Sequence, residues 1–308
     1  METLTKILAQ YDILEIEPRD LIRESSDNQV YIIGKDNKKV IRLSKKLSVE
    51  DVQFEYEAIQ HLAKNNFPVA KWIETKNNNF YSSSDEVGVA VMFDFLKGYH
   101  AQVNKDSLPT KEQAHTAGNI LGKLAKIGQT FQPSSPRSRN IFVELERVLQ
   151  NEDIFKRDFK GRKEFVEQVK TSLAFAQEQK TSTGLIHNDY NPGNVFFKTD
   201  TLINGVIDFD WSCIGPSIKD LAHGVVEWSF PDGAKESNFE IFDTFIEGYN
   251  TTAENKIAKG KELYSWIMFA VLSAAATYFC DRLSDLEQKK DVNYSYMYNK
   301  YLFFSKHN

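Results

Sequence analysis

The 308-residue sequence predicts an α+β protein of two lobes, a smaller β-rich N-terminal lobe and a larger, mostly helical C-terminal lobe. Short apolar runs separated by turn residues continue as far as Phe95, and helical spacing of apolar residues prevails after Lys97-Gly98. One stretch, 185–210, interrupts the helical part with two short apolar runs that each end in acidic side chains. We therefore expect lobes at residues 1–95 and 96–308, in a chain long enough for two cores.

The start of the N-terminal lobe predicts a short helix followed by a hairpin. Residues 1–12 carry an apolar face made of Leu4, Ile7, Leu8 and Tyr11. Apolar runs at 30–33 and 39–43 then flank the turn dipeptide Asp36-Asn37. Two strands around a short polar turn form a hairpin.

The rest of this lobe predicts one helix and three more strands. Helical spacing begins after Ser48, a residue type that favours the N-cap position. Phe67-Pro68 ends the helix, because the residue before a proline disfavours helical geometry. The strands are expected at 70–74, 80–82 and 87–93.

The C-terminal lobe predicts helices at 111–131, 141–150 and 163–178, and again from Ser217 to the end of the chain. The segment 263–280 carries no charge and just reaches the length that spans a membrane. Serine, threonine and tyrosine interrupt it, acidic residues bracket it, and no basic cluster marks a cytoplasmic side. We expect a buried helix there and no membrane partner.

Composition excludes several classes of protein. A net charge of −5 argues against a general nucleic-acid surface. The two cysteines, Cys213 and Cys280, lie far apart without metal-ligand spacing, which favours a reducing compartment over a disulfide framework. Residues 1–20 contain no apolar core with a small-residue cleavage site, so we expect no secretory signal and a cytoplasmic protein.

The motif that points to chemistry is His187-x-Asp189 with Asn194 five residues further on, followed by an apolar run that ends in Asp208. Phosphoryl transfer from a magnesium nucleotide needs one carboxylate facing the attacking hydroxyl, and an amide and a second carboxylate on the metal. We expect Asp189 to orient the hydroxyl and accept its proton, and Asn194 and Asp208 to bind magnesium. His187 is expected to brace the loop, and Pro192-Gly193 to allow the reversal that returns Asn194 to the site.

Two features of this region leave alternatives open. Asp210 lies beside Asp208 if the strand continues, so it either assists at the site or forms a cap or loop hydrogen bond. His187, Asp189 and the distant His223 also resemble the two-histidine, one-carboxylate triad of iron(II) oxygenases. Those enzymes need a long β-barrel, whereas this sequence turns helical after Trp211.

The stretches HNDYNPGNVFF and GVIDFDWSCIGPSIKDLA resemble the aminoglycoside phosphotransferase and choline kinase superfamily, whose fold is protein-kinase-like. The resemblance is strong over 185–222 and weaker over 25–62 and 90–98. It implies a small-molecule kinase that uses ATP and Mg and phosphorylates a hydroxyl. It also implies that Asp220 is structural.

The same resemblance implies residues for the nucleotide. Arg42 stands where relatives carry a cation toward the phosphates, and Glu55 falls where the following helix pairs with that cation. Residues 92–96 would form the hinge that reaches the adenine, and the implied cofactor-binding residues there are Met92, Phe93 and Phe95. The phosphate-covering loop has Ser25-Ser26-Asp27-Asn28 where relatives often have two glycines, and the serine hydroxyls and the Asn28 amide could compensate.

The carboxyl-terminal part, LSAAATYFCDRLSD and YMYNKYLFF, resembles the homoserine kinases of this superfamily. Homoserine needs an acid and a cation, and Glu227 and Arg282 are candidates beside Asp189 and Asp210. Arg282 equally suits an i,i+3 pair with Asp285 on an exposed helix. The acceptor stays open among amino alcohols, amino acids and aminosugars. A protein Ser/Thr kinase and a non-catalytic nucleotide-binding regulatory module remain alternatives, and the sequence does not predict the oligomeric state.

Overall fold

A six-stranded antiparallel sheet forms the N-terminal lobe, in the order β1-β2-β3-β6-β4, with β5 paired to β6. The computed structural model describes residues 2–17, 19–24, 28–104, 106–158, 162–288 and 296–307. The lobe contains α1 (Glu2–Leu8), β1 (Arg19–Glu24), β2 (Asn28–Ile33), β3 (Lys39–Ser44), α2 (Val49–Lys64), β4 (Trp72–Ile73), β5 (Ser82–Ser84) and β6 (Gly88–Asp94). These strands end at Asp94, and we keep residue 95 as the proposed boundary.

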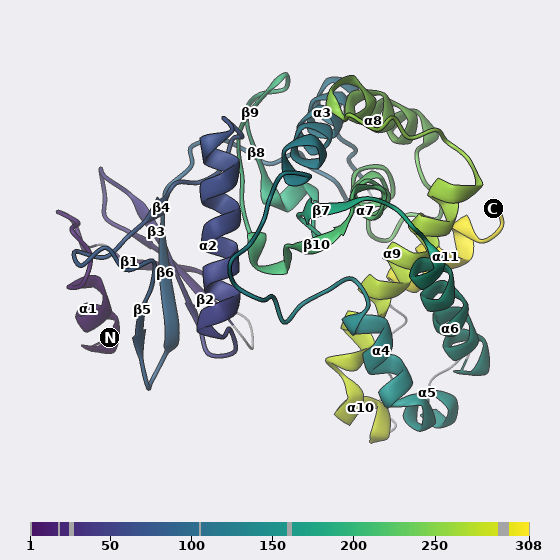
Figure 1. Cartoon of the computed structure of the whole chain (residues 1–308), viewed down its shortest axis with the longest axis horizontal. Coiled ribbons are helices and arrows are strands. Elements are labelled where there is room, and N and C mark those ends of the chain that lie inside the picture. The colour runs from purple at the N-terminus through teal and green to yellow at the C-terminus, as the bar shows by residue number, and fades with distance from the viewer. Residues whose placement is uncertain are drawn as a thin grey trace.

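One helix covers each face of the sheet (Figure 1). On the outer face, the predicted apolar stripe of α1 and the following Tyr11 are all buried, in a cluster with Ile33, Ile41 and Met92. Helix α2 lies on the other face, toward the C-terminal lobe. Ser48 caps it as predicted, because the Ser48 hydroxyl accepts the backbone N–H of Asp51 at 3.1 Å.

Strand β1 is absent from the sequence prediction, and its exposure explains why. Five of its six residues are exposed and none is buried, so no alternation of apolar and polar residues marks it. It joins the sheet by pairing with β2, from Arg19 opposite Ile33 to Glu24 opposite Gln29. The predicted strand 70–74 shortens to two residues, which pair with β6 at its hinge end.

The linker between the lobes is attached to the catalytic half of the chain. Tyr99 and Phe197 exchange two backbone hydrogen bonds, at 3.0 and 2.8 Å. Gly98 precedes this contact at a φ of +151°, and a Cβ there would collide with the Phe197 carbonyl. The sheet is therefore anchored close to the loop that carries Asp189.

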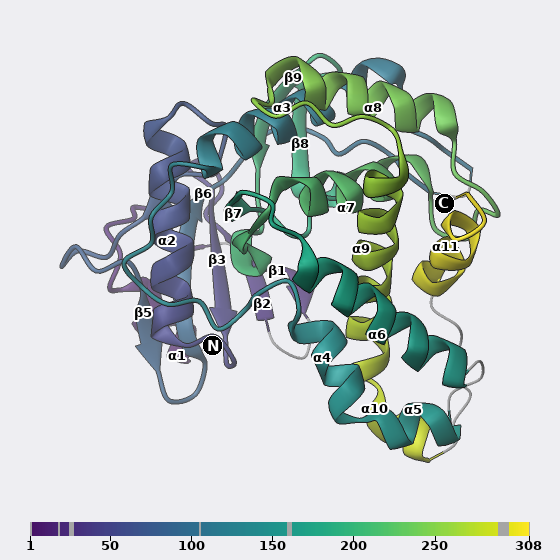
Figure 2. The same ribbon diagram turned by 45° about the vertical axis from the view of Figure 1, so that its right-hand side comes forward.

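The C-terminal lobe is built around helix α9 (Lys261–Cys280), which lies at its centre (Figures 1 and 2). Its helices are α3 (Lys111–Gly128), α4 (Val143–Gln150), α5 (Glu152–Asp158), α6 (Arg162–Glu178), α7 (Ser217–Ser229), α8 (Phe239–Thr252), α9 (Lys261–Cys280), α10 (Leu283–Glu287) and α11 (Tyr296–Phe304). Its strands are β7 (Thr183–Ile186), β8 (Val195–Thr199), β9 (Leu202–Val206) and β10 (Cys213–Pro216).

Helix α9 is the uncharged segment that the sequence predicts to be a buried helix and not a membrane span. It is long and apolar enough to cross a membrane by length and composition, yet 67% of its most apolar stretch is buried inside the protein. It packs against α7, α11 and α4. Its apolar character is that of a core helix.

Glycines allow α3 and α8 to pack at very short separation. A Cβ on Gly118 would overlap the carbonyl oxygen of Phe245, and one on Gly248 would overlap the backbone of His115. We expect Gly118→Ala to lower the free energy of unfolding by about 1–3 kcal/mol, because an overpacked helix contact forces backbone shifts. Urea unfolding followed by circular dichroism measures this.

The matched control is Gly260→Ser, at the N-cap of α9. A Cβ there meets nothing within 4 Å, and serine is a favoured cap. We expect this variant to unfold within about 0.5 kcal/mol of the wild type. Equal stability of Gly118→Ala and wild type would contradict the close approach of the two helices.

Candidate active site

The loop after β7 is held by an acid from α7. The Asp220 carboxylate accepts the backbone N–H groups of His187 and Asn188, both at 2.8 Å. The His187 ring donates from Nε2 to the Ile207 carbonyl at 2.9 Å and accepts the Asp189 backbone N–H on Nδ1 at 3.3 Å. His187 and Asp220 thus brace the loop, as expected from the sequence.

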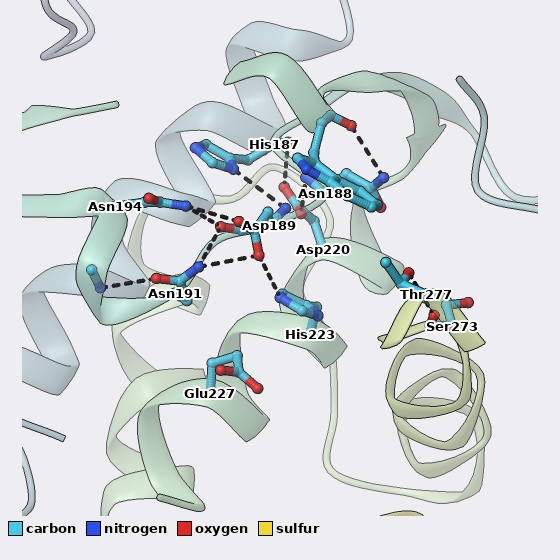
Figure 3. Close-up of polar contacts among 12 residues, drawn as sticks. His187, Asn188, Asp189, Asn191, Asn194, Asp220, His223, Glu227, Ser273 and Thr277 are labelled. Carbon is cyan, nitrogen blue, oxygen red and sulfur yellow. Dashed lines mark hydrogen bonds and ion pairs between the residues drawn. The ribbon is translucent and has the colours of Figure 1, made fainter. Parts of the chain in front are cut away.

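The loop brings Asp189 and Asn194 together (Figure 3). Asn191 caps the short turn Pro192–Asn194 by accepting the Gly193 N–H at 2.9 Å, and this reverses the chain. The Asn194 amide then donates to Oδ2 of Asp189 at 3.0 Å, and the Asn191 amide donates to Oδ1 at 3.1 Å. Both oxygens of Asp189 therefore have a fixed direction.

Electrostatics keep Asp189 ionised. Burial raises the pKa of Asp189, but contact with the imidazole of His223, the electrostatic interaction with the His187 ring and the Asn191 amide lower it by more, so that the pKa lies below its ordinary value. The side chain is still 33% exposed. An ionised, accessible carboxylate is the form that a proton acceptor needs.

Asp208 lies next to this loop, although not at the end of a strand. Strand β9 ends at Val206, and Asp208 follows in the left-handed region with a φ of +67°. The Ile207 N–H donates to the Asn194 carbonyl at 3.0 Å, which joins the Asp208 turn to the Asp189 loop. The Asp208 carboxylate is 3.2 Å from Nη1 of Arg23 and 3.7 Å from Nη1 of Arg42.

Of the two roles left open for Asp210, the structure shows the loop hydrogen bond, and Asp210 lines neither of the two cavities described below. The strand stops, and Asp210 lies instead in a short 3-10 turn, Phe209–Trp211. Its Oδ2 accepts the Asn28 amide at 3.3 Å. Burial and then the charge of Asp208 raise the pKa of Asp210 well above its ordinary value.

A buried ion pair joins the sheet to α2. Nη2 of Arg42 on β3 is 2.5 Å from Oε2 of Glu55 on α2, and the side chains are 6% and 1% exposed. Burial would lower the pKa of Arg42, but Glu55, Asp210 and Asp208 raise it by more. Arg42 is therefore a permanent cation directed at the Asp208 turn.

Glu55→Ala should lower the free energy of unfolding by at least about 2 kcal/mol, because it leaves the Arg42 charge buried without its closest partner. Asp208 and Asp210 remain nearby, so we place the loss below that of a fully isolated buried charge. Urea unfolding measures it. The control is Glu50→Ala in the exposed first turn of the same helix, expected to cost under about 1 kcal/mol. Equal effects of the two variants would contradict the role of the ion pair.

A cavity of about 200 Å³ lies between the lobes beside this pair. Its walls are mostly apolar, and they include Phe93 and Phe95 with Arg42, Glu55 and Asp208 at the polar end. Met92, expected here, is absent from the walls. Neighbouring strand residues point to opposite faces, so Met92 packs under α1 while Phe93 faces the cavity. Asn28 contacts Asp210, and residues 25–27 lie outside the described part of the chain.

A second cavity, of about 290 Å³, opens on the other side of the loop within the C-terminal lobe. Asp189, His223 and Glu227 line one wall, and Ser273 and Thr277 of α9 line the opposite one (Figure 3). Glu227 is also 3.3 Å from Nζ of the buried Lys300. Asp189 thus faces this cavity, and Asp208 faces the first.

Arg282, one candidate for contact with the substrate, is not among the residues that line this cavity. Helix α9 ends at Cys280, and Arg282 folds back to donate to the Tyr278 carbonyl at 3.0 Å, with its guanidinium 3.7 Å from the Tyr278 ring centroid. Two cations line the wall, Arg139 and Lys219. The Arg139 guanidinium lies 3.6 Å from the ring centroid of Trp211 and donates to Glu144 at 3.1 Å.

His223 is the residue whose role here the sequence reasoning missed. Asp220, His223 and Glu227 follow one another at i, i+3 and i+7, so they share one face of α7. That spacing could have placed His223 beside the loop that Asp220 holds. Arg139 had no comparable signal, because its contact with Trp211 is set by tertiary packing.

The directions of the His187 ring nitrogens contradict the hypothesis of an iron(II) oxygenase triad. Nε2 of His187 donates to a carbonyl and Nδ1 accepts an N–H, so neither nitrogen is directed at a shared metal position with His223. Among the described residues, no group of three or more His, Cys, Asp or Glu side chains could hold a metal ion. The expected oxygen ligands Asp208 and Asn194 belong to two turns that the hydrogen bond from Ile207 to Asn194 joins.

An antiparallel sheet with a buried Arg–Glu pair, facing a helical lobe with an Asp–Asn loop and a second Asp, defines a two-lobed phosphotransferase. Residues 20–259 match the model of the phosphotransferase enzyme family, APH. The chain belongs to this family. The predicted superfamily, the protein-kinase-like fold and the phosphotransferase class are thereby confirmed.

Individual proteins agree with this membership. A homoserine kinase of Zymomonas mobilis is 27% identical over 237 residues, which cover 74% of this chain and 70% of the relative. Among solved structures, the amicoumacin kinase hAmiN, in complex with AMP-PNP, Ca²⁺ and Ami, superposes with a TM-score of 0.73 at 14% identity, covering 95% of each chain. A microcompartment-associated aminopropanol kinase superposes with a TM-score of 0.68 at 16% identity, covering 99% of this chain and 97% of the other.

Proposed function

We propose that this chain transfers the γ-phosphate of ATP, in a magnesium-dependent reaction, to the hydroxyl of a small amino acid or amino alcohol, with L-homoserine as the first candidate. The observation that carries the proposal is the pairing of Asp189 with Asn194 and the joining of that loop to the Asp208 turn. Asp189 faces one cavity and Asp208 faces the other, so the loop separates a donor site from an acceptor site.

The cavity between the lobes is the proposed nucleotide site. Phe93 and Phe95 supply apolar walls, as a planar base requires, and Arg42 supplies a guanidinium toward the phosphates. The known structure of hAmiN contains a nucleotide analogue and a divalent cation, and this supports nucleotide use by the present chain.

The residues also fit a divalent cation. Burial and then the charge of Asp208 raise the pKa of the neighbouring Asp210, so two acidic side chains lie close together at this turn. Asp208 and the Asn194 amide oxygen would hold magnesium there. Bound magnesium neutralises the charge that develops on the transferred phosphoryl group.

The residues of the chain divide the remaining tasks. Asp189 would orient the acceptor hydroxyl and take its proton late in the transfer. Arg42, fixed by Glu55, would position the phosphates. Asp220 and His187 keep the loop in place.

The charges of the acceptor cavity favour an amino acid. Glu144, Asp189 and Glu227 are acidic, and Arg139 and Lys219 are cations on the same surface, so the cavity offers charges of both signs to a zwitterion. A polycationic aminosugar would favour acids alone. The homoserine kinase relative supports the same acceptor.

A coupled ADP-release assay over L-homoserine, 1-amino-2-propanol, several aminoglycosides and a Ser/Thr peptide tests the proposal. We expect magnesium-dependent ADP release with L-homoserine above the rate without acceptor. Release with the peptide alone would favour a protein kinase. A protein that binds ATP but releases no ADP with any acceptor would be a regulatory module, and the proposal would be rejected. The cytoplasmic location and the absence of nucleic-acid and membrane partners stay predictions.

A further inference from the structure

His223 differs from His187 in the hydrogen bonds that its ring nitrogens make. The His187 ring has a hydrogen-bond partner on each nitrogen, which is the pattern of a structural histidine. Nε2 of His223 is buried, and it has no hydrogen-bond partner among the described residues. A buried donor left without a partner is costly, so such a group in an open cavity indicates a bound ligand.

The direction of His223 identifies what that ligand would contact. Its Nε2 lies 3.4 Å from Oδ1 of Asp189, longer than a good N–H···O hydrogen bond. Both residues line the acceptor cavity, and Figure 3 shows the two side chains directed toward one another. One donor and one acceptor side by side match a hydroxyl group, which donates its proton to the carboxylate and accepts the imidazole N–H on its oxygen.

The opposite wall supports a ligand in the same place. Ser273 on α9 is 8% exposed, and its hydroxyl oxygen is also buried without a partner among the described residues. Ser273 and His223 line the same cavity from facing helices. Two such side chains around one space favour a small polar ligand between α7 and α9.

We propose that His223 is a substrate-binding residue that holds the acceptor hydroxyl together with Asp189, an inference that rests on the proposed kinase function. The hydroxyl oxygen keeps one lone pair for the new bond to the γ-phosphorus while another accepts from Nε2 of His223. The bond between that phosphorus and the β,γ-bridging oxygen breaks, ADP leaves, and the hydroxyl proton passes to Asp189. His223 thereby fixes which lone pair faces the phosphorus.

Two substitutions separate this role from a structural one. His223→Leu removes the donor and keeps an apolar side chain of similar reach. His223→Gln keeps an N–H donor at the distance of Nε2. Each is assayed for homoserine-dependent ADP release, for slow ATP hydrolysis without acceptor, in which water takes the place of the hydroxyl, for ATP affinity and for Tm.

We expect His223→Leu to lower both rates about 10- to 100-fold, with ATP affinity within about twofold of the wild type. His223→Gln should recover rates to within about fivefold. Wild-type rates in the leucine variant would overturn the proposal. So would equal losses in both variants accompanied by a lower Tm, because they would make His223 a brace for the loop.

Assays of the wild type show separately whether the proposed kinase function is wrong. If the wild type neither binds ATP nor releases ADP, the proposed function is wrong and the role of His223 falls with it. If the wild type hydrolyses ATP but ignores L-homoserine, the hydrolysis rates of the two variants still decide the role of His223.

Discussion

Asp189→Asn should reduce turnover by at least about 10³-fold while ATP affinity stays within about twofold of the wild type. The amide has the size of the carboxylate and can still accept from one of the two donating amides, Asn191 or Asn194, but it cannot accept the hydroxyl proton. Asp189 faces the acceptor cavity and not the nucleotide cavity, so binding of the nucleotide should persist. Steady-state ADP release and calorimetric titration with ATP measure the two quantities.

The control is Asp12→Asn, an exposed aspartate outside both cavities, which should keep wild-type turnover. Wild-type turnover in the Asp189→Asn variant would remove Asp189 as the proton acceptor. A joint loss of turnover and ATP affinity would also count against this account, because it would place Asp189 at the nucleotide.

The lowered pKa of Asp189 has a consequence for stability. A carboxylate with a folded-state pKa below its unfolded value stabilises the folded protein above the unfolded pKa, and this contribution is lost as pH falls through the folded pKa. The stability difference between wild type and Asp189→Asn should therefore shrink toward zero as pH falls below about 3.8. Urea unfolding of both proteins across this range checks the sign of the effect.

Asp208→Ala should weaken ATP binding in the presence of magnesium by about 10- to 100-fold and reduce turnover by at least about 10³-fold. ATP binding without magnesium should change little, because Asp208 would act on the nucleotide through the cation. Titrations with ATP, with and without magnesium, separate the magnesium-dependent part of ATP binding from the magnesium-independent part.

Asp20→Ala, at an exposed position on β1, serves as the control and should behave as the wild type. An unchanged magnesium requirement in the Asp208→Ala variant would show that the cation is held elsewhere. The coordination proposed for Asp208 and Asn194 would then be wrong.

Short-range patterns made much of the site predictable. The loop from His187 to Asn194 follows from fixed spacing and from Pro192-Gly193, whose turn chemistry returns the amide to the carboxylate. The Arg42–Glu55 pair is implied by the family resemblance, and the predicted helix after the Ser48 cap contains Glu55. In each case the decisive geometry lies within one or two neighbouring elements.

Contacts that depend on tertiary packing were not predictable in the same way. Whether Met92 faces the cavity depends on strand register, and one position along β6 reverses the answer. Arg282 and Arg139 are both cations near the C-terminal helices, and only their contacts with Tyr278 and Trp211 decide which one lines the cavity. His223 lies 34 residues from Asp189 in the sequence. The two side chains come together only because helix α7 packs against the loop.

The most direct test of the account is a crystal structure of the chain with magnesium and AMP-PNP. We expect one carboxylate oxygen of Asp208 and the amide oxygen of Asn194 at about 2.0–2.1 Å from the cation. Asp189 should face the γ-phosphate across a space that fits one hydroxyl. A cation bound by other side chains, or an Asp189 carboxylate directed away from the γ-phosphate, would contradict the account.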